Sequence, residues 1–263
     1  MQDRKTALVT GASSGLGTAL AEGLAGRGYD LILTARSRAA MEELAVRLRS
    51  QPGVNVTVVE ADLSRPEGVT DLTGKIDALG LKPTVVVNNA GSGLNEQFVD
   101  HNRDRLTAML HLNVLSLSEL SRFYGQRMAT AGRGYILLVA SVAAYQPDPL
   151  MAAYGASKAY VLSLGEALHV ELSPRIGVTV LSPGFMETGF SAASGFAPTR
   201  ATLRTALPPA KVARIGLEAM FRGEPTVIAG GRNRLMIFIA RLLPRMFVAR
   251  QVYKAAGTSL HAK

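Results

Sequence analysis

Tyr154 and Lys158 stand four residues apart in the stretch AAYGASKAY, among small residues. On a helix, positions i and i+4 share a face, so the lysine ammonium can lie close to the tyrosine hydroxyl. Lowering the pKa of a tyrosine from about 10 to about 7 takes roughly 4 kcal/mol, which is about what one cation about 4 Å away supplies at an effective dielectric constant near 20. The pair predicts a general acid for carbonyl reduction, with Tyr154 as the general base in the reverse reaction.

A glycine-rich turn precedes this pair, near the N-terminus. The stretch TGASSGLG places Gly11, Gly15 and Gly17 between an apolar run and a segment with helical spacing. Glycines at such a turn let the backbone approach a pyrophosphate, whose charge is stabilised at the helix N-terminus. The spacing departs from the G-x-G-x-x-G pattern of dinucleotide sites, and a plain strand-to-helix turn is the alternative.

The end of the second apolar run bears on which nucleotide is bound. An NAD site usually has an acid there, whereas this chain has Ala35 and Arg36 in the stretch LTARSR. A guanidinium offers a 2′-phosphate a charge-assisted contact, so Arg36 favours NADP(H) over NAD, with Arg38 as a second contact. A solvated surface arginine is the alternative interpretation of Arg36.

Short β-branched runs and longer segments with helical spacing alternate along the chain. The seven predicted strands lie at 5–10, 30–35, 54–61, 83–90, 134–141, 177–182 and 225–230, and helices are predicted at 15–28, 38–50, 75–82, 103–131 and 154–173. Strands that are apolar on both faces indicate an α/β fold: a doubly wound, seven-stranded parallel sheet of the Rossmann type between two helical layers. We expect a single domain over 1–231, followed by an extension over 232–263.

The motifs, taken in order, carry a family resemblance. They are TGxxxGxG at 10–17, Asp62, NNAG at 88–91, Asn113, Ser141, YxxxK at 154–158 and PGxxxT at 183–188. This set, over about residues 4–230, resembles the short-chain dehydrogenase/reductase family. The resemblance implies an NADP(H)-dependent oxidoreductase that transfers hydride between the nicotinamide and a carbonyl or secondary alcohol, with Tyr154, Lys158, Ser141 and Asn113 as catalytic residues.

Further roles follow from this resemblance. Lys158 is expected to hold the nicotinamide ribose, and the backbone carbonyl of Asn113 a water that links Lys158 to solvent. Ser141 ends a predicted strand, where its hydroxyl can donate to the substrate carbonyl oxygen, although it could also cap the next turn. The cofactor-binding residues implied are Gly11, Ser13, Ser14, Gly15, Leu16, Gly17, Arg36, Asp62, Leu63, Asn89, Ala90, Gly91, Tyr154, Lys158, Pro183, Gly184 and Thr188.

Composition narrows the class of protein. The chain has no cysteine, its four histidines are scattered without the spacing of a metal site, and no apolar run reaches the length of a membrane span. These features predict a cytoplasmic protein without a metal. The net charge is +9, but residues 1–199 hold 17 basic and 18 acidic residues, so the excess lies in residues 200–263. A basic excess confined to one end argues against nucleic acid as a partner.

Two segments toward the C-terminus have predicted roles. Residues 189–210 match the position of a mobile substrate loop in the family, and Phe190, Phe196 and Leu203 suit an apolar substrate. The extension 232–263 is amphipathic and basic, with a bend expected at Pro244. Three interpretations stand for it: docking on the body or on a second subunit, lying on an anionic membrane surface, or receiving an anionic acyl carrier.

The resemblance leaves alternatives for function. A catalytically silent NADP-binding scaffold or sensor usually lacks one of Tyr, Lys and Ser, and here all three are present. An NADP-using epimerase would use much the same residues. The long helices at 103–131 and 154–173 resemble those that pair subunits in the family, which predicts a homo-oligomer, either a dimer or a tetramer.

Overall fold

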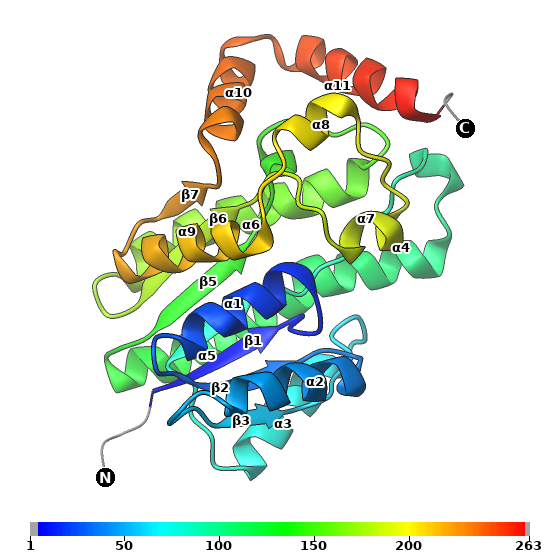
Figure 1. The fold of residues 1–263 in the computed structure, drawn as a ribbon. Helices are drawn as coiled ribbons and strands as arrows, with labels where there is room; N and C mark the ends of the chain where they lie inside the picture. The colour runs from blue at the N-terminus through cyan, green and yellow to red at the C-terminus, as the bar shows by residue number, and fades with distance from the viewer. Residues whose placement is uncertain (1–4, 261–263) are drawn as a thin grey trace.

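Residues 5–260 are described by a computed structural model, and their centre is a parallel sheet (Figure 1). The strands are β1 (Thr6–Thr10), β2 (Asp30–Thr34), β3 (Val56–Val58), β4 (Val85–Asn88), β5 (Tyr135–Val139), β6 (Gly177–Ser182) and β7 (Thr226–Ile228). They form one seven-stranded sheet in the order β3-β2-β1-β4-β5-β6-β7. Each predicted strand therefore forms, and the predicted doubly wound parallel sheet is confirmed.

Helices cover both faces of the sheet. The helices α1 (Gly15–Ala25), α2 (Arg38–Arg49) and α9 (Pro209–Phe221) pack on one face, and α3 (Gly68–Ala78), α5 (Leu117–Ala131) and α6 (Ala152–Leu172) on the other. Neighbouring strand residues point to opposite layers: Leu8 and Val86 face the second group, whereas Val9 and Val87 face the first, and all four are fully buried. Burial of both faces explains why the strands are almost continuously apolar.

Shorter elements complete the chain. They are α4 (Arg103–Leu110), the 3-10 helices Phe98–Asp100 and Val142–Tyr145, a π-helical turn at His111–Ser116, α7 (Gly189–Ser194), α8 (Arg200–Arg204), α10 (Gly231–Leu242) and α11 (Arg245–Leu260). The predicted substrate loop thus contains two short helices. No helix among the described residues is long and apolar enough to cross a membrane.

Two helix boundaries illustrate what determines them. The third helix begins at Gly68 rather than at Lys75, and its predicted continuation to Lys82 is wrong because Gly80 adopts a φ of 69°, which ends the helix. The bend expected at Pro244 is present as a complete break between α10 and α11. Leu243 has extended backbone, which is the usual conformation before a proline.

The carboxyl ends of the strands lie at one edge of the sheet, and the loops that follow them carry the predicted site. The strand order reverses between β1 and β4, because β2 and β3 lie beyond β1 while β5 to β7 lie beyond β4. Such a switch point opens a crevice beyond the strand ends. The loops after β1 and β4 flank this point and contain Gly11 and Asn89.

Candidate nucleotide-binding and catalytic site

The glycine-rich turn after β1 leaves no room for side chains. Gly11 has a φ of 65° and Gly15 a φ of 54°, which are left-handed conformations that favour glycine. A Cβ at Gly11 would lie 2.9 Å from the Ala90 Cα, and a Cβ at Gly17 would overlap the Gly11 carbonyl oxygen. The three glycines therefore permit a close approach between the turn, the start of α1 and the loop after β4.

The N-terminus of α1 suits an anion. Ser14 is the N-cap residue, but its side chain makes no capping hydrogen bond to the first turn of this 11-residue helix. The backbone N–H groups of that turn can therefore receive a phosphate. Thr188, from the PG motif, packs on the other side of the turn, because a Cβ at Gly15 would lie 3.0 Å from its Cγ2. Ser13 and Leu16 complete the turn, with Leu16 buried.

Hydrogen bonds join the loop after β4 to the loop after β1. The Asn89 Nδ2 donates to the Thr10 carbonyl oxygen at 2.9 Å, and the backbone N–H groups of Asn89 and Ala90 donate to the Thr10 hydroxyl at 3.0 and 2.9 Å. Gly91 follows, and a Cβ there would lie 3.2 Å from the Lys158 Nζ. This loop thus connects the glycine turn with the residues on α6.

Tyr154 and Lys158 are both buried on α6, with 9% and 4% of their surfaces exposed. The Lys158 Nζ donates a hydrogen bond to the carbonyl oxygen of Val139 at 2.8 Å, and it lies 5.8 Å from the centre of the Tyr154 ring. Ser141 follows β5 and interacts with the Tyr154 hydroxyl through a side-chain hydrogen bond. Its hydroxyl also accepts from the Ala143 N–H at 3.2 Å, so the capping role considered for it is present as well.

The direction of the Tyr154 pKa differs from the expectation. Burial raises the pKa of Tyr154 to about 12, because an ionised phenol loses hydration in this site, and the Asp148 carboxylate acts in the same direction. The hydrogen bond with Ser141 opposes the shift, whereas Lys158 is not among its causes. Burial also lowers the pKa of Lys158, to about 8. The predicted lowering by Lys158 is therefore wrong for the protein chain by itself, and Tyr154 is a neutral hydrogen-bond donor at neutral pH.

Asn113 lies in the π-helical turn between α4 and α5 and is completely buried. Its Nδ2 donates to the Ser92 carbonyl oxygen at 2.9 Å and to the Ser157 hydroxyl at 3.0 Å, while its Oδ1 accepts from the Ser92 N–H at 3.0 Å. The side chain therefore links α6 to the loop after β4. A π-turn is often found at functional sites because it presents one residue out of the regular helical register.

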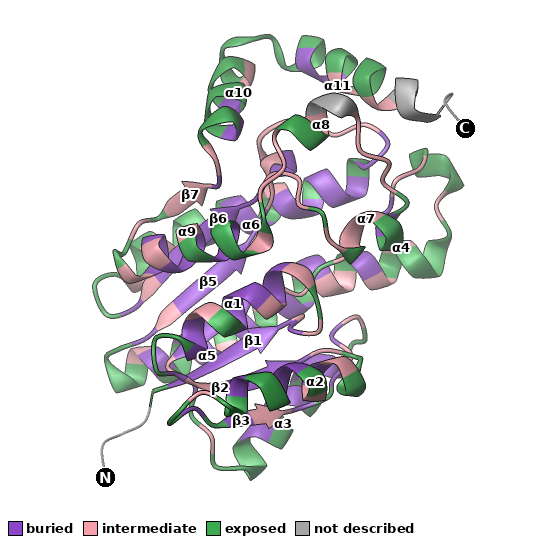
Figure 2. Cartoon of the chain, viewed as in Figure 1, coloured by how far each residue is buried: buried purple, intermediate pink, exposed green. Residues whose placement is uncertain are grey.

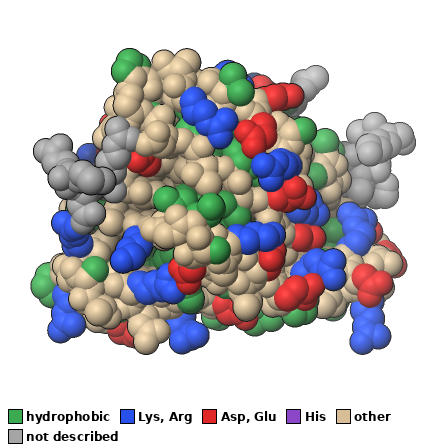
Figure 3. Space-filling model, turned by 90° about the horizontal axis from the view of Figure 1, so that it is seen from below, with side chains coloured by type: hydrophobic (Ala, Val, Ile, Leu, Met, Phe, Trp, Pro, Cys, Tyr) green, Lys and Arg blue, Asp and Glu red, His purple; other side chains and the backbone are tan. Residues whose placement is uncertain are grey.

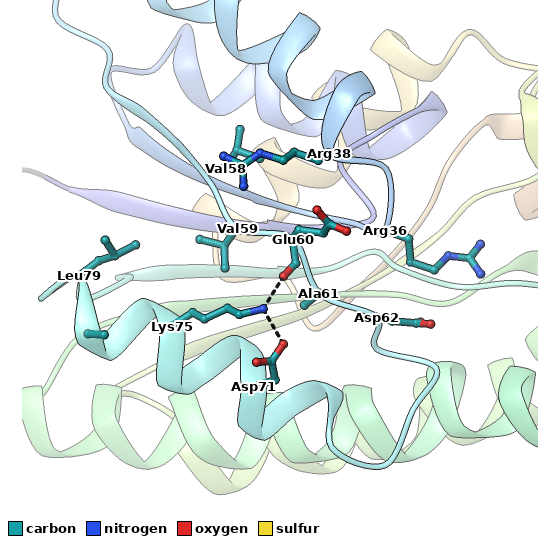
Figure 4. A pocket seen from close by; sticks show the side chains of 11 residues that line it. Arg36, Arg38, Val58, Val59, Glu60, Ala61, Asp62, Asp71, Lys75 and Leu79 are labelled. Carbon is teal, nitrogen blue, oxygen red and sulfur yellow. Dashed lines mark hydrogen bonds and ion pairs between the residues drawn. The ribbon is translucent and has the colours of Figure 1, made fainter.

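Arg36 and Asp62 lie together at the far end of the crevice, on the rim of a cavity of about 720 Å³ (Figure 4). Burial favours a raised pKa for Asp62, but hydrogen bonds from Ser64 and the charge of Arg36 hold it below its ordinary value. The exposed Arg36 guanidinium makes no ion pair within the described residues, so it is available to an anion. Arg38 pairs with Glu42 at 3.4 Å and points away from Arg36, which argues against the second contact expected.

The other predicted cofactor residues take structural positions around these. Leu63 is buried, and its carbonyl oxygen accepts a hydrogen bond from the Ser116 hydroxyl at 2.6 Å. The Pro183 carbonyl oxygen accepts from the Val142 N–H at 2.9 Å. Gly184 packs directly on the side chain of Asn233, at the start of α10. The PG motif is therefore held between the loop after β5 and the C-terminal extension.

An apolar cluster surrounds the Tyr154 ring. Leu94, Met109 and Met151 are buried in it, and Phe190 and Phe196 from the predicted substrate loop pack against it. The centres of the Tyr154 and Phe190 rings are 5.5 Å apart. The substrate loop therefore reaches the phenol, as the position of Phe190 after the PG motif suggested.

Two residues near the site were not singled out in the sequence. Asp148 lies in the loop before α6 and is partly buried; burial raises its pKa to about 7. Asn233 is 3% exposed, and its Nδ2 donates to the Ala229 carbonyl oxygen at 2.7 Å. An acid between two prolines six residues before Tyr154 was a usable signal for Asp148, whereas nothing in the pattern distinguishes Asn233 from its neighbours.

The fold and the site define a nucleotide-binding protein of the doubly wound α/β class, and comparisons with known proteins agree. A family model described as short chain dehydrogenase matches residues 5–196. The 11-beta-hydroxysteroid dehydrogenase A of Sesamum indicum is 36% identical over 194 residues, which cover 70% of this chain and 53% of that protein. The chain thus spans about half the length of this curated relative.

Solved structures extend the similarity beyond the matched segment. A short-chain dehydrogenase from Sphingobium yanoikuyae in complex with NADPH is 31% identical, with a TM-score of 0.80 over 90% of this chain and 94% of that one. A short-chain dehydrogenase/reductase from Burkholderia phymatum in complex with NAD is 26% identical, with a TM-score of 0.80 over 91% and 93%. This chain belongs to the short-chain dehydrogenase/reductase family of oxidoreductases, which confirms the resemblance of its motifs, and a nicotinamide cofactor is supported.

Proposed function

We propose that this protein is an NADP(H)-dependent oxidoreductase that transfers hydride between the nicotinamide and a carbonyl or secondary alcohol of an apolar substrate, with Tyr154 as general acid. The observation that carries the proposal is the neutral, buried Tyr154 hydroxyl, held beside Ser141 and enclosed by an apolar cluster. A cofactor bound along the crevice supplies or accepts the hydride. The chain itself supplies the proton and the donors for the substrate oxygen.

Reduction is the direction that the protonation state favours. A phenol with a pKa of about 12 is almost entirely protonated at neutral pH, so it can donate to a carbonyl oxygen as negative charge develops there. The Ser141 hydroxyl can donate to the same oxygen, because it already reaches the Tyr154 hydroxyl. In the oxidative direction Tyr154 must first lose its proton, which the buried environment opposes.

Lys158 acts as a fixed cation beside the acid. Its pKa of about 8 keeps most of the ammonium charged at neutral pH, and its hydrogen bond to Val139 fixes its position. This ammonium lies 5.8 Å from the centre of the Tyr154 ring. We propose that the neighbouring Asn113 backbone provides the route by which the proton is replaced, because the Asn113 side chain already fixes this turn against α6.

The cofactor preference rests on Arg36. Its guanidinium is exposed and unpaired within the described residues, and Asp62 lies close enough for the arginine charge to lower its pKa. A 2′-phosphate would pair with this arginine, whereas a ribose 2′-hydroxyl would gain much less from it. Solved relatives with NADPH and with NAD are both known, so the preference for NADP(H) is proposed from Arg36 alone.

The substrate class follows from the lining of the catalytic end. Leu94 and Met151 are buried beside Tyr154 and Phe190 packs against them, so the surroundings of the phenol are apolar, which suits a hydrophobic ketone or alcohol. The relative from Sesamum indicum is named a hydroxysteroid dehydrogenase, which agrees with a bulky apolar substrate.

Fluorescence titration with NADPH and NADH, followed by turnover on a panel of hydrophobic ketones, tests the proposal. We expect tighter binding of NADPH and cofactor oxidation with at least one ketone. Tighter binding of NADH would overturn the assignment of Arg36. Intact cofactor binding without turnover on any ketone or aldehyde would instead support a silent scaffold.

A further inference from the structure

The C-terminal helices α10 and α11 present an unusually apolar surface. Among the described residues, half of the exposed large apolar side chains lie within residues 235–253. Leu235, Phe238, Leu242, Met246 and Phe247 belong to this set, and Leu242 is 71% exposed. In Figure 2 most of α10 and much of α11 are coloured as exposed. An exposed patch of this kind usually marks a surface that meets a partner.

The helices are nevertheless anchored on the protein. Asn233 packs on Gly184, the Arg232 guanidinium donates to the Arg204 carbonyl oxygen at 2.9 Å, and Arg241 lies over the Tyr145 ring. Ile237 is buried on the same helix as the exposed residues. One side of α10 therefore docks on the body, while the apolar residues Leu235 and Ile239 of its other side stay uncovered.

The charge of this segment has one sign. No acidic residue follows Glu224, whereas six basic residues lie within 231–256. Arg234, Arg245, Arg250 and Lys254 are exposed among the apolar side chains. The far side of the molecule differs, since acidic and basic side chains lie next to one another there (Figure 3).

Charge complementarity decides which partner fits. Two copies that met through this surface would bring cations together without acidic partners in the segment. An anionic lipid surface suits both the apolar side chains and the positive charge of this segment. Apolar side chains can enter the interfacial region while arginines pair with phosphates. We propose that α10 and α11 dock this protein on the surface of an anionic bilayer. The helices would lie in the interface, since neither is long and apolar enough to cross it.

Co-sedimentation of the full chain with vesicles tests this proposal. We expect binding to phosphatidylcholine vesicles that contain phosphatidylglycerol, binding at least about tenfold weaker to pure phosphatidylcholine, and release at high salt. Phe238→Ser with Leu242→Ser removes apolar contacts, and Arg245→Gln with Arg250→Gln removes charges. Each pair should weaken binding by about tenfold or more, and the second should also reduce the salt dependence.

Val46→Ser with Arg47→Gln is the matched control, because both residues are exposed on α2, far from α10 and α11. It should leave vesicle binding unchanged, and circular dichroism should show that every variant remains folded. Equal binding to neutral and anionic vesicles would overturn the proposal, as would binding that none of the α10 and α11 variants alters. A dimer that Phe238→Ser with Leu242→Ser dissociates, without any vesicle binding, would assign the surface to a second copy instead.

Discussion

Asp148 packs directly on Gly155, the residue that follows Tyr154 on α6. A Cβ added at Gly155 would lie 2.8 Å from the Asp148 Cβ, so only glycine allows the loop before α6 to come this close. The contact brings the Asp148 carboxylate near the Tyr154 hydroxyl. Among the described residues, this carboxylate forms no ion pair. Burial is the main reason that the pKa of Tyr154 is raised, and the Asp148 charge acts in the same direction.

The charge of Asp148 should affect the pH dependence of the reaction through Tyr154. Asp148→Asn removes the negative charge, so the pKa of Tyr154 should fall and the pH at which alcohol oxidation rises should shift to lower values. The pH profile of kcat/KM with a secondary alcohol measures this shift. Asp100→Asn, at an exposed acid, is the control. Identical pH profiles for wild type and Asp148→Asn would contradict an electrostatic role.

Asp148 should also affect stability in a pH-dependent way. Its carboxyl has a pKa of about 7 in the folded protein and an ordinary value of 3.8. A raised carboxyl pKa contributes stability that is present at low pH and lost as the pH rises through about 7. Asp148→Asn should therefore be more stable than wild type by on the order of 1–3 kcal/mol at about pH 8 and by less at about pH 5. Denaturant unfolding at both pH values checks this, and an equal difference at the two would refute it.

Tyr154→Phe removes the proposed acid while it keeps the ring that packs on Phe190. We expect kcat for ketone reduction to fall by roughly 10²–10⁴ with NADPH binding preserved, because only the transferred proton is lost. Tyr160→Phe on the same helix is the control, since its hydroxyl is bonded to Ser118 at 2.9 Å and the residue is exposed. Full activity of Tyr154→Phe would remove Tyr154 from the mechanism.

A side chain at Gly17, in the glycine-rich turn after β1, should disturb both nucleotide binding and folding. Gly17→Ala would bring a Cβ against the Gly11 carbonyl oxygen, so we expect weaker nucleotide binding and a loss of about 1–3 kcal/mol in the free energy of unfolding. Gly74→Ala on α3 has open space around its Cβ and should stabilise by about 0.5–1 kcal/mol. Calorimetry and thermal unfolding compare the two variants. Equal effects would show that the turn tolerates a side chain.

Arg36 can be tested against its neighbour Arg38. Arg36→Ala should raise the Kd for NADPH by about 10-fold or more and leave the Kd for NADH nearly unchanged, because only the 2′-phosphate loses a partner. Arg38→Ala should alter neither, since that side chain pairs with Glu42. An equal increase in the Kd for NADPH and for NADH would show that Arg36 does not bind the 2′-phosphate.

Much of the fold could be predicted from local patterns. The strands could be predicted from β-branched apolar runs in the sequence. Right-handed crossovers between parallel strands then place the helices in layers on the two faces of the sheet. The approach of Tyr154 to Lys158 is also local, because it follows from helical spacing. Helix boundaries such as the start of α3 were harder to predict from the sequence, because Thr70 and Gly74 have weak helix propensity. These residues are held in the helix by the packing of Val69 and Leu72 in the core.

The electrostatics of the site could not be predicted in this way. The pKa of Tyr154 depends on burial by residues distant in sequence, such as Leu94 and Phe190, and on the charge of Asp148. The exposure of Leu242 likewise follows from which side of α10 meets the body. An amphipathic pattern alone predicts an apolar face but not what covers it.

The π-helical turn at His111–Ser116 gives the segment 103–131 two rotational phases. One inserted residue turns a helix by about 100° relative to an uninterrupted one. Deleting a single residue from this turn should therefore merge α4 and α5 into one rod and swing Met109 away from the cluster around Tyr154. The position of Met109 in the cluster around Tyr154 therefore depends on the extra residue of this turn as well as on the side chains that pack there.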